Sequence, residues 1–493
     1  MSRSRRGGFA SVLIGLFLLV VLGIVVFLMF KDNTIPEVSL TPKTAYTSPK
    51  QEFTLKVSDV DSGVQSVVVT VKKGDNISTV LNQVFSPAVK SQELKFSLAD
   101  TGIKDGKLEL EVVVNDSSYA GFGRGNKNII KLPLTIDMTP PRFEVKTMPP
   151  YIRKGGTACA VYSVNKDTAS TGVKVGDYFF EGFKQANGDY LVFFAFPYHM
   201  TPNEFSPQLI AEDLAGNIGK IPLAVNRINR EFRKDNIPIT DNFLDTKMPE
   251  FEQDIPGEMT NLERFLKVNS ELRKANQDTI RALVSKTNPE PLWTGVFLRL
   301  PNAATRAGFA DHRTYMYNNQ KIDEQTHLGQ DLASLAQSPI PAANNGIIVF
   351  VGSLGIYGHL VVIDHGCGLQ TLYSHLNDYS VEVGQAVKKG DIIGRTGKTG
   401  MAAGDHLHFG VTVGGIEVMP LEWFDPHWIK DNIVDRVNSA GGSMQPITVL
   451  PDIYATPTAP PANSDKKATD KPDKKAKKAT KKTTEKKNKK ATN

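Results

Sequence analysis

The sequence predicts a mainly β protein: two immunoglobulin-like β-sandwich modules, a helical connector and a C-terminal β-sheet domain, all preceded by one transmembrane helix. Three observations predict this order. Short alternating strands separated by turn residues fill residues 33–226 and return over 291–428. Apolar residues recur at helical spacing over 260–284, and an uncharged, mostly apolar run covers 9–30. At 493 residues the chain is long enough for about three domains, each with its own core.

The N-terminal apolar run predicts a membrane anchor. Residues 1–8 contain three arginines, and residues 9–30 carry no charge before Lys31 and Asp32. About 20 apolar residues cross a bilayer as a helix, whereas a signal peptide has an apolar core of about 7–15. No small-x-small cleavage site follows, which disfavours the alternative of a cleaved signal peptide. The arginines favour a cytoplasmic N-terminus. We therefore expect a single-pass protein of the cell inner (cytoplasmic) membrane, with everything after Lys31 periplasmic or extracellular.

Two β modules are expected next, over residues 33–137 and 140–226. Residues 67–71 are rich in β-branched side chains, and residues 107–112 alternate between apolar and charged ones. Strands at this spacing over roughly 100 residues are typical of an immunoglobulin-like sandwich. Residues 211–217 resemble the closing turn of many bacterial immunoglobulin-like modules. Two interpretations of these modules stay open: spacers, or units that bind a ligand.

A linker and helical connector is expected over residues 227–290. Between residues 260 and 284 the apolar residues fall largely at helical spacing. Thr260 or Asn261 is a suitable N-cap because Glu263 lies just inside the first turn. We expect this helix to pack on the following domain as a structural brace, without chemistry of its own.

The C-terminal segment, residues 456–493, is predicted to be a disordered Lys-rich tail because it has too few apolar residues to form a core. Residues 465–493 contain 13 Lys and 4 Asp or Glu, a net charge of +9, so the rest of the +6 chain is about −3. The folded part is therefore not basic, and nucleic-acid binding is not expected. The tail has two interpretations: binding of anionic envelope polymers or a membrane surface, or a solubilising appendage.

Histidine placement predicts a metal site. Seven of the nine histidines lie between residues 312 and 408. His327 and Asp331 are expected on one face of a strand at i and i+4, and His406 and His408 on one face at i and i+2. Imidazole and carboxylate are ligands that Zn²⁺ prefers, and three protein ligands leave an open, catalytic position. The alternative is a set of surface or core histidines, which two such patterns in one glycine-rich β domain disfavour.

Five stretches of the segment from about residue 311 to 424 form a further pattern: HLGQD (327–331), GHLVVIDHG (358–366), LYSHL (372–376), VGQAVKKG (383–390) and GDHLHF (404–409). In these stretches the segment resembles the lysostaphin-like (LytM-type) zinc metalloendopeptidases, which are cell-wall hydrolases. The resemblance implies an antiparallel β-sheet groove within residues 291–428. It also implies that His327, Asp331 and His408 bind Zn²⁺ and that His375 and His406 are the catalytic pair, while His365 either orients the site from behind the ligands or is purely structural.

The resemblance implies a zinc-dependent endopeptidase that hydrolyses stem peptides or cross-bridges of peptidoglycan, and the N-terminal apolar run predicts that this enzyme is membrane-anchored. All five family positions are filled, which disfavours the alternative of a non-catalytic wall-binding activator of a separate amidase. Proteolysis of a protein substrate is a second alternative. Gln330 and Gly410 depart from the family pattern, and this bears on substrate preference. No HExxH motif occurs, so a helical glutamate base is not expected. Autoinhibition by residues 311–325 is also left open.

Overall fold

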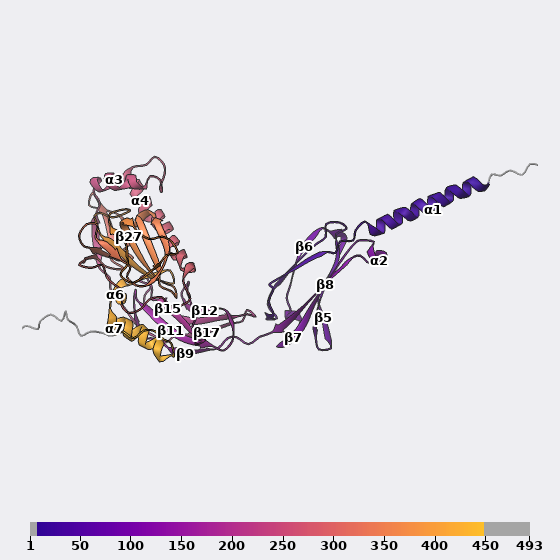
Figure 1. The fold of residues 1–493 in the computed structure, drawn as a ribbon, viewed down its shortest axis with the longest axis horizontal. Helices are drawn as coiled ribbons and strands as arrows, with labels where there is room; N and C mark the ends of the chain where they lie inside the picture. Colours follow the sequence, from indigo (N-terminus) through magenta and orange to yellow (C-terminus); the bar gives the residue numbers. More distant parts are fainter. Residues whose placement is uncertain (1–6, 448–493) are drawn as a thin grey trace, which may run out of the picture. The chain divides into compact units, whose positions relative to one another are not determined.

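The computed structural model describes residues 7–447, whose helices and strands are shown in Figure 1. This part of the chain is mainly β, as predicted. The predicted disordered tail, residues 456–493, lies outside the described residues, as do residues 1–6 of the predicted cytoplasmic N-terminus.

The first element is helix α1 (Gly7–Phe30). The prediction of a transmembrane helix is wrong. A bilayer core of about 30 Å needs about 20 consecutive apolar residues in one helix, and no helix within the described part of the chain is long and apolar enough to meet that need. The predicted single-pass placement in the inner membrane depended on this helix and is wrong with it.

Two sheets enclose one core in the first β domain. Its strands are β1 (Glu37–Thr41), β2 (Tyr46–Thr47), β3 (Phe53–Ser58), β4 (Val64–Lys73), β5 (Asn76–Val89), β6 (Ser91–Phe96), β7 (Gly106–Asp116) and β8 (Lys127–Ile136). One sheet has the order β1-β3-β6 and the other β2-β8-β7-β4-β5. Alternate residues of each strand, such as Phe53 and Leu55 or Val67 and Val69, are buried between the sheets because side chains along a strand point to opposite faces.

The second β domain repeats this strand pairing. Its strands are β9 (Phe143–Thr147), β10 (Tyr151–Arg153), β11 (Thr157–Val164), β12 (Thr168–Val175), β13 (Tyr178–Glu181), β14 (Phe183–Lys184), β15 (Tyr190–Ala195), β16 (Gln208–Asp213), β17 (Ile218–Pro222) and β18 (Asn226–Ile228). The run β9-β11-β15 corresponds to β1-β3-β6, and β13-β12-β16-β17 corresponds to β5-β4-β7-β8. The immunoglobulin-like assignment of the two domains stays a prediction.

The connector forms helices that pack on the C-terminal domain. Its elements are β19 (Lys234–Pro238), α3 (Asp241–Lys247), η2 (Met248–Phe251), α4 (Asn261–Lys267), η3 (Val268–Leu272), α5 (Arg273–Ala282) and η4 (Leu283–Lys286). The predicted cap is confirmed, because Thr260 and Glu263 form a reciprocal capping box. Phe265, Val268 and Ile280 share a buried cluster with Leu360 and Val362 of the C-terminal sheet.

The C-terminal domain is built on a ten-stranded sheet, with β19-β21-β22 as a separate three-stranded sheet. The elements are β20 (Ala304–Ala307), β21 (His312–Tyr317), β22 (Gln320–Thr326), β23 (Gln330–Ala333), β24 (Pro339–Pro341), β25 (Gly346–Ser353), η5 (Gly355–Tyr357), β26 (His359–Asp364), β27 (Leu369–Tyr379), β28 (Ala386–Val387), β29 (Ile392–Thr396), β30 (Leu407–Val413) and β31 (Ile416–Val418). The path β20-β23-β30-β27-β26-β25-β28 brings β23, β30 and β27, which are distant in sequence, side by side.

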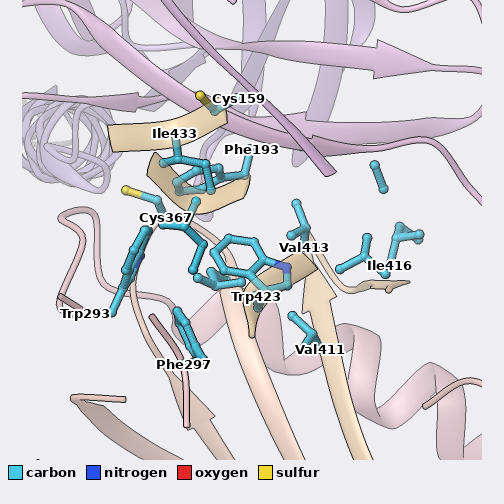
Figure 2. Close-up of a cluster of buried hydrophobic side chains, with 14 of the residues drawn as sticks. Cys159, Phe193, Trp293, Phe297, Cys367, Val411, Val413, Ile416, Trp423 and Ile433 are labelled. Carbon is cyan, nitrogen blue, oxygen red and sulfur yellow. The ribbon is translucent and has the colours of Figure 1, made fainter. Parts of the chain in front are cut away.

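The second β domain and the C-terminal domain share one hydrophobic core. Helices α6 (Pro420–Trp423), α7 (Pro426–Ile429), η6 (Lys430–Val434) and α8 (Asp435–Ser439) follow the sheet. Figure 2 shows Trp423 at the centre of this junction, together with Phe193 from β15 and Val411 from β30. The rings of Phe193 and Trp423 meet edge to face at 6.2 Å. The two domains therefore bury their apolar surfaces against one another.

Candidate metal centre

Two neighbouring strands bring the predicted metal ligands together. In the antiparallel pair β23–β30, Asp331 lies directly opposite His408. The expectation that His327 and Asp331 share a strand is wrong, because β23 begins at Gln330 and His327 lies in the loop before it. The loop nevertheless turns the His327 side chain toward Asp331.

The three predicted ligands meet through one atom each. His327 Nε2 lies 2.9 Å from Asp331 Oδ1 and 2.9 Å from His408 Nδ1. His408 Nδ1 lies 3.0 Å from Asp331 Oδ1. All three side chains are buried. The site is thus an enclosed triangle of two nitrogens and one oxygen.

Backbone contacts set the direction of the two imidazoles. His327 Nδ1 donates to the carbonyl of Gly308 at 2.7 Å, and this leaves Nε2 as the nitrogen that faces the triangle. The His408 ring lies against Gly329, where an added Cβ would be 2.5 Å from His408 Nε2 and 2.8 Å from the carbonyl oxygen of Phe409. Only glycine therefore leaves room for this imidazole.

Asp331 is held as a charged carboxylate. Burial opposes its charge, yet the neighbouring histidines hold the pKa of Asp331 well below its usual value. Its second oxygen, Oδ2, accepts a hydrogen bond from the guanidinium of Arg313 at 3.1 Å. Arg313 comes from β21 and was not foreseen from the sequence, where no local pattern marks it.

The predicted catalytic pair lies beside the triangle. The rings of His375 and His406 are 4.9 Å apart, and His406 Nε2 is 3.5 Å from Asp331 Oδ1. Each Nδ1 donates to a backbone carbonyl, at 2.8 Å in both residues. His375 has a φ of +63°, a left-handed conformation that non-glycine residues adopt mainly under local constraint.

The two imidazoles of this pair differ in basicity. Burial, together with the neighbouring histidines, lowers the pKa of His375 well below its ordinary value. Burial also disfavours charge on His406, but the Asp331 carboxylate outweighs it and raises the pKa of His406. The structure therefore favours a neutral His375 and a more basic His406.

The donor set fits a zinc ion. With His327 Nδ1 bound to the carbonyl of Gly308, its Nε2 points at the carboxylate oxygen of Asp331 and at Nδ1 of His408, both at 2.9 Å. Three atoms that can each ligate a metal thus converge at one buried point. Two imidazole nitrogens and one carboxylate oxygen are ligands that Zn²⁺ favours, and three protein ligands leave a position open.

The three predicted ligands and the predicted catalytic pair line one cavity of about 330 Å³. Much of its wall is apolar and comes from the connector, through Ile239, Phe243 and Phe265. The segment for which autoinhibition was left open contributes Arg313 and Tyr315 to the same wall. The connector is therefore more than the expected structural brace, because contacts between distant parts of the chain place its side chains at the cavity.

His365 is not brought into this cavity. Its Nδ1 donates to the carbonyl of Asn345 at 2.7 Å, and its Nε2 is 2.8 Å from the Thr371 hydroxyl oxygen. The ring packs edge to face on Phe297 at 4.9 Å. Burial lowers the pKa of His365 to about 4, so this imidazole is neutral and buried in the sheet interior.

The fold and the site together define a metallopeptidase domain. Residues 325–420 match the family model described as Peptidase family M23, so the chain carries an M23 metallopeptidase domain. The match includes all five residues of the cavity that the sequence analysis predicted. It confirms the resemblance to the lysostaphin-like enzymes.

Several known proteins are similar in sequence to this domain. The chain is 40% identical over 95 residues to the DD-carboxypeptidase/endopeptidase Mpg of Neisseria meningitidis, covering 19% of this chain and 22% of Mpg. It is 37% identical over 89 residues to the peptidoglycan DD-endopeptidase ShyA of Vibrio cholerae, covering 18% and 21%. The match thus spans about a fifth of these curated relatives. The solved catalytic domain of lysostaphin from Staphylococcus simulans is 28% identical, with a TM-score of 0.23, covering 25% of this chain and 94% of that domain.

Proposed function

We propose that this protein is a zinc-dependent endopeptidase that hydrolyses peptide bonds of peptidoglycan. One observation carries the proposal: His327 Nε2, Asp331 Oδ1 and His408 Nδ1 converge within 3.0 Å of one another. Two further imidazoles, of His375 and His406, line the same cavity. Purely structural histidines would not need three ligand atoms to converge at one buried point.

The proposed substrate is the peptide part of peptidoglycan, in its stem peptides or cross-bridges. The names of Mpg and ShyA describe DD-endopeptidases, which supports cleavage of the D,D cross-link between stem peptides. The cavity supplies apolar surface from Phe243 and Phe265 and positive charge from Arg273. These groups suit a short peptide with a carboxylate.

The proposed reaction uses side chains in three roles. A zinc ion bound by His327, Asp331 and His408 supplies Lewis-acid chemistry: it polarises a carbonyl group and lowers the pKa of water. Neutral His375 can accept a proton on Nε2, because its Nδ1 donates to Thr399. The more basic His406 can hold a proton and return it to the leaving amine.

The other regions of the chain have proposed roles as well. We place the endopeptidase domain within residues 291–428 and two immunoglobulin-like modules within 33–137 and 140–226. The matching strand pairing of the two modules supports a common origin of their fold. Among the described residues, neither module contributes a side chain to the cavity of the metal centre. This suits a role of the modules as spacers.

The test combines metal analysis with digestion of purified cell wall by the full-length chain. Wild-type protein should hold one zinc per chain and should release monomeric muropeptides, detected by mass spectrometry. His408→Ala should lose both zinc and activity, because it removes a ligand. His406→Ala should keep zinc and lose about 10²–10⁴-fold in rate. His427→Ala is the matched control, because His427 is exposed and lies outside the cavity.

Four outcomes would contradict the proposal or a part of it. Full activity of the chelator-treated protein would exclude a metal mechanism, and full activity of His406→Ala would exclude its catalytic role. Zinc binding without wall digestion would instead favour the alternative of a wall-binding activator of a separate amidase. Digestion of protein substrates but not of wall would redirect the proposal to general proteolysis.

A further inference from the structure

The first β domain contains three buried carboxylates that face one another. Asp32, Asp59 and Asp116 are 8%, 4% and 0% exposed. One oxygen from each lies within 4.8 Å of the others. Within residues 7–447, none of the three forms an ion pair with a lysine or arginine. Three carboxylates this close together repel one another in a buried place, so a cation bound between them would stabilise the cluster.

Three connections of the domain supply the cluster. Asp32 precedes β1, Asp59 directly follows β3, and Asp116 is the last residue of β7. Asp32 accepts hydrogen bonds from the backbone N–H groups of Thr34 and Ser62, each at 3.0 Å. Each carboxylate is therefore held in place by neighbouring backbone.

The second β domain contains an equivalent site, which shows the position of a cation. Asp116 accepts the backbone and side-chain N–H groups of Asn126, at 2.7 and 2.8 Å. Asp213, at the end of the corresponding strand β16, accepts the same two groups of Asn217, at 2.9 and 3.1 Å. Asp116 and Asp213 thus occupy the same place in the repeated fold.

The strand register shows which residues of the second domain correspond to Asp32 and Asp59. Ser58 at the end of β3 pairs with Glu37 of β1. After β11, the backbone N–H of Asn165 donates to the carbonyl of Arg142, at the corresponding place before β9. Five residues before Glu37 and Arg142 stand Asp32 and Asp137, respectively.

The residue that follows Ser58 in the first domain differs from the one that follows Asn165 in the second. It is Asp59 in the first domain and Lys166 in the second. The ammonium group of Lys166 lies 2.6 Å from Asp137 Oδ2 and 2.8 Å from Asp213 Oδ2, and it also donates to the carbonyl of Thr139 at 2.5 Å. The second domain therefore carries its own cation at the point where the first domain has a third carboxylate.

We propose that the first β domain binds one Ca²⁺ ion between Asp32, Asp59 and Asp116. Calcium takes six to eight oxygen ligands at about 2.3–2.6 Å, so two ligands of one ion lie at most about 5 Å apart. The 4.8 Å limit on the carboxylate oxygens satisfies this condition. The site has only oxygen donors, which exclude the thiolate and imidazole chemistry that favours zinc. The Ser62 hydroxyl oxygen is enclosed beside Asp32 and can supply a further oxygen ligand.

The ion has a structural role. It joins the chain segment that enters the domain, at Asp32, to the β3–β4 and β7–β8 connections. In the second domain Lys166 belongs to one of the three corresponding segments, and its side chain binds the other two through Asp137 and Asp213. Calcium thus stabilises the first domain in the way that a built-in ammonium group stabilises the second.

The test is calcium titration of the full-length, chelator-treated chain by isothermal calorimetry. The wild type should bind one Ca²⁺ with a Kd below about 1 mM. Asp59→Asn should weaken binding at least tenfold, and Asp59→Lys should abolish it, because it introduces the cation found in the second domain. Asp75→Asn, which removes an exposed carboxylate of the same domain, should bind as the wild type does.

Two controls keep the result specific. His408→Ala should retain calcium binding, which separates this site from the metal centre, and circular dichroism should show that Asp59→Lys is folded. If that variant is unfolded, the tenfold loss in Asp59→Asn decides. No binding to the wild type at millimolar calcium, wild-type binding by both Asp59 variants, or equally tight Mg²⁺ binding would overturn the proposal.

Discussion

The carboxyl group of Glu422 should make the junction between the second β domain and the C-terminal domain sensitive to pH. Glu422 is the third residue of α6 and is buried. Its Oε2 accepts the backbone N–H of Thr157, at the start of β11, at 2.8 Å. Burial raises the pKa of Glu422 from 4.5 to about 8, because the charged form is poorly solvated there.

The sign and size of the effect follow from this pKa. The folded protein binds a proton at Glu422 that the unfolded chain releases above pH 4.5, so the free energy of unfolding falls as pH rises from 4.5 to about 8. A difference of one pKa unit corresponds to about 1.4 kcal/mol. The loss across this window is therefore up to about 5 kcal/mol. Glu422→Gln stays neutral and should remove this dependence.

Tryptophan fluorescence provides a selective assay. The three tryptophans of the chain, Trp293, Trp423 and Trp428, all lie at or against the core of this junction. Urea unfolding followed by their emission, at intervals between pH 4.5 and 8.5, should show a falling midpoint for the wild type. The midpoint of Glu422→Gln should stay nearly constant.

The control for Glu422→Gln is the loss of a carboxylate at an exposed position. Glu382→Gln removes an exposed carboxylate of the same domain and should follow the wild-type curve. A wild-type midpoint that does not change over this pH range would refute the reasoning. So would a Glu422→Gln variant whose midpoint falls as steeply as that of the wild type.

Three further substitutions test the site and its walls. Gly329→Ala would place a methyl group 2.5 Å from the His408 imidazole and should weaken zinc binding at least about tenfold by metal titration. Gly404→Ala, which meets nothing within 4 Å, should not. Arg313→Ala removes the guanidinium bound to the ligand carboxylate and should weaken zinc binding about 10–100-fold in the same titration. Phe265→Ala empties a fully buried site and should destabilise the connector by about 3–5 kcal/mol, measured by hydrogen exchange of residues 260–286.

Local sequence patterns predicted which imidazoles lie together at the cavity. The spacing of His406 and His408 was sufficient because a strand repeats every two residues, so Leu407 and Phe409 enter the core while both imidazoles reach the cavity. The loop conformation of His327 was not predictable in this way. No periodicity describes a loop, and the contact with Gly308 that orients the ring joins segments from either side of a hairpin.

The sequence by itself determined the residue types that can bind a metal, the capped helix at Thr260 and the alternation that buries each strand, because these depend on neighbours within a few positions. Only the tertiary structure decided which distant groups meet. It placed Arg313 on Asp331, enclosed Glu422 beneath β11, and set Asp59 where the second domain has Lys166. Strand pairing between remote segments creates these contacts, and their energies depend on burial and charge that no local pattern records.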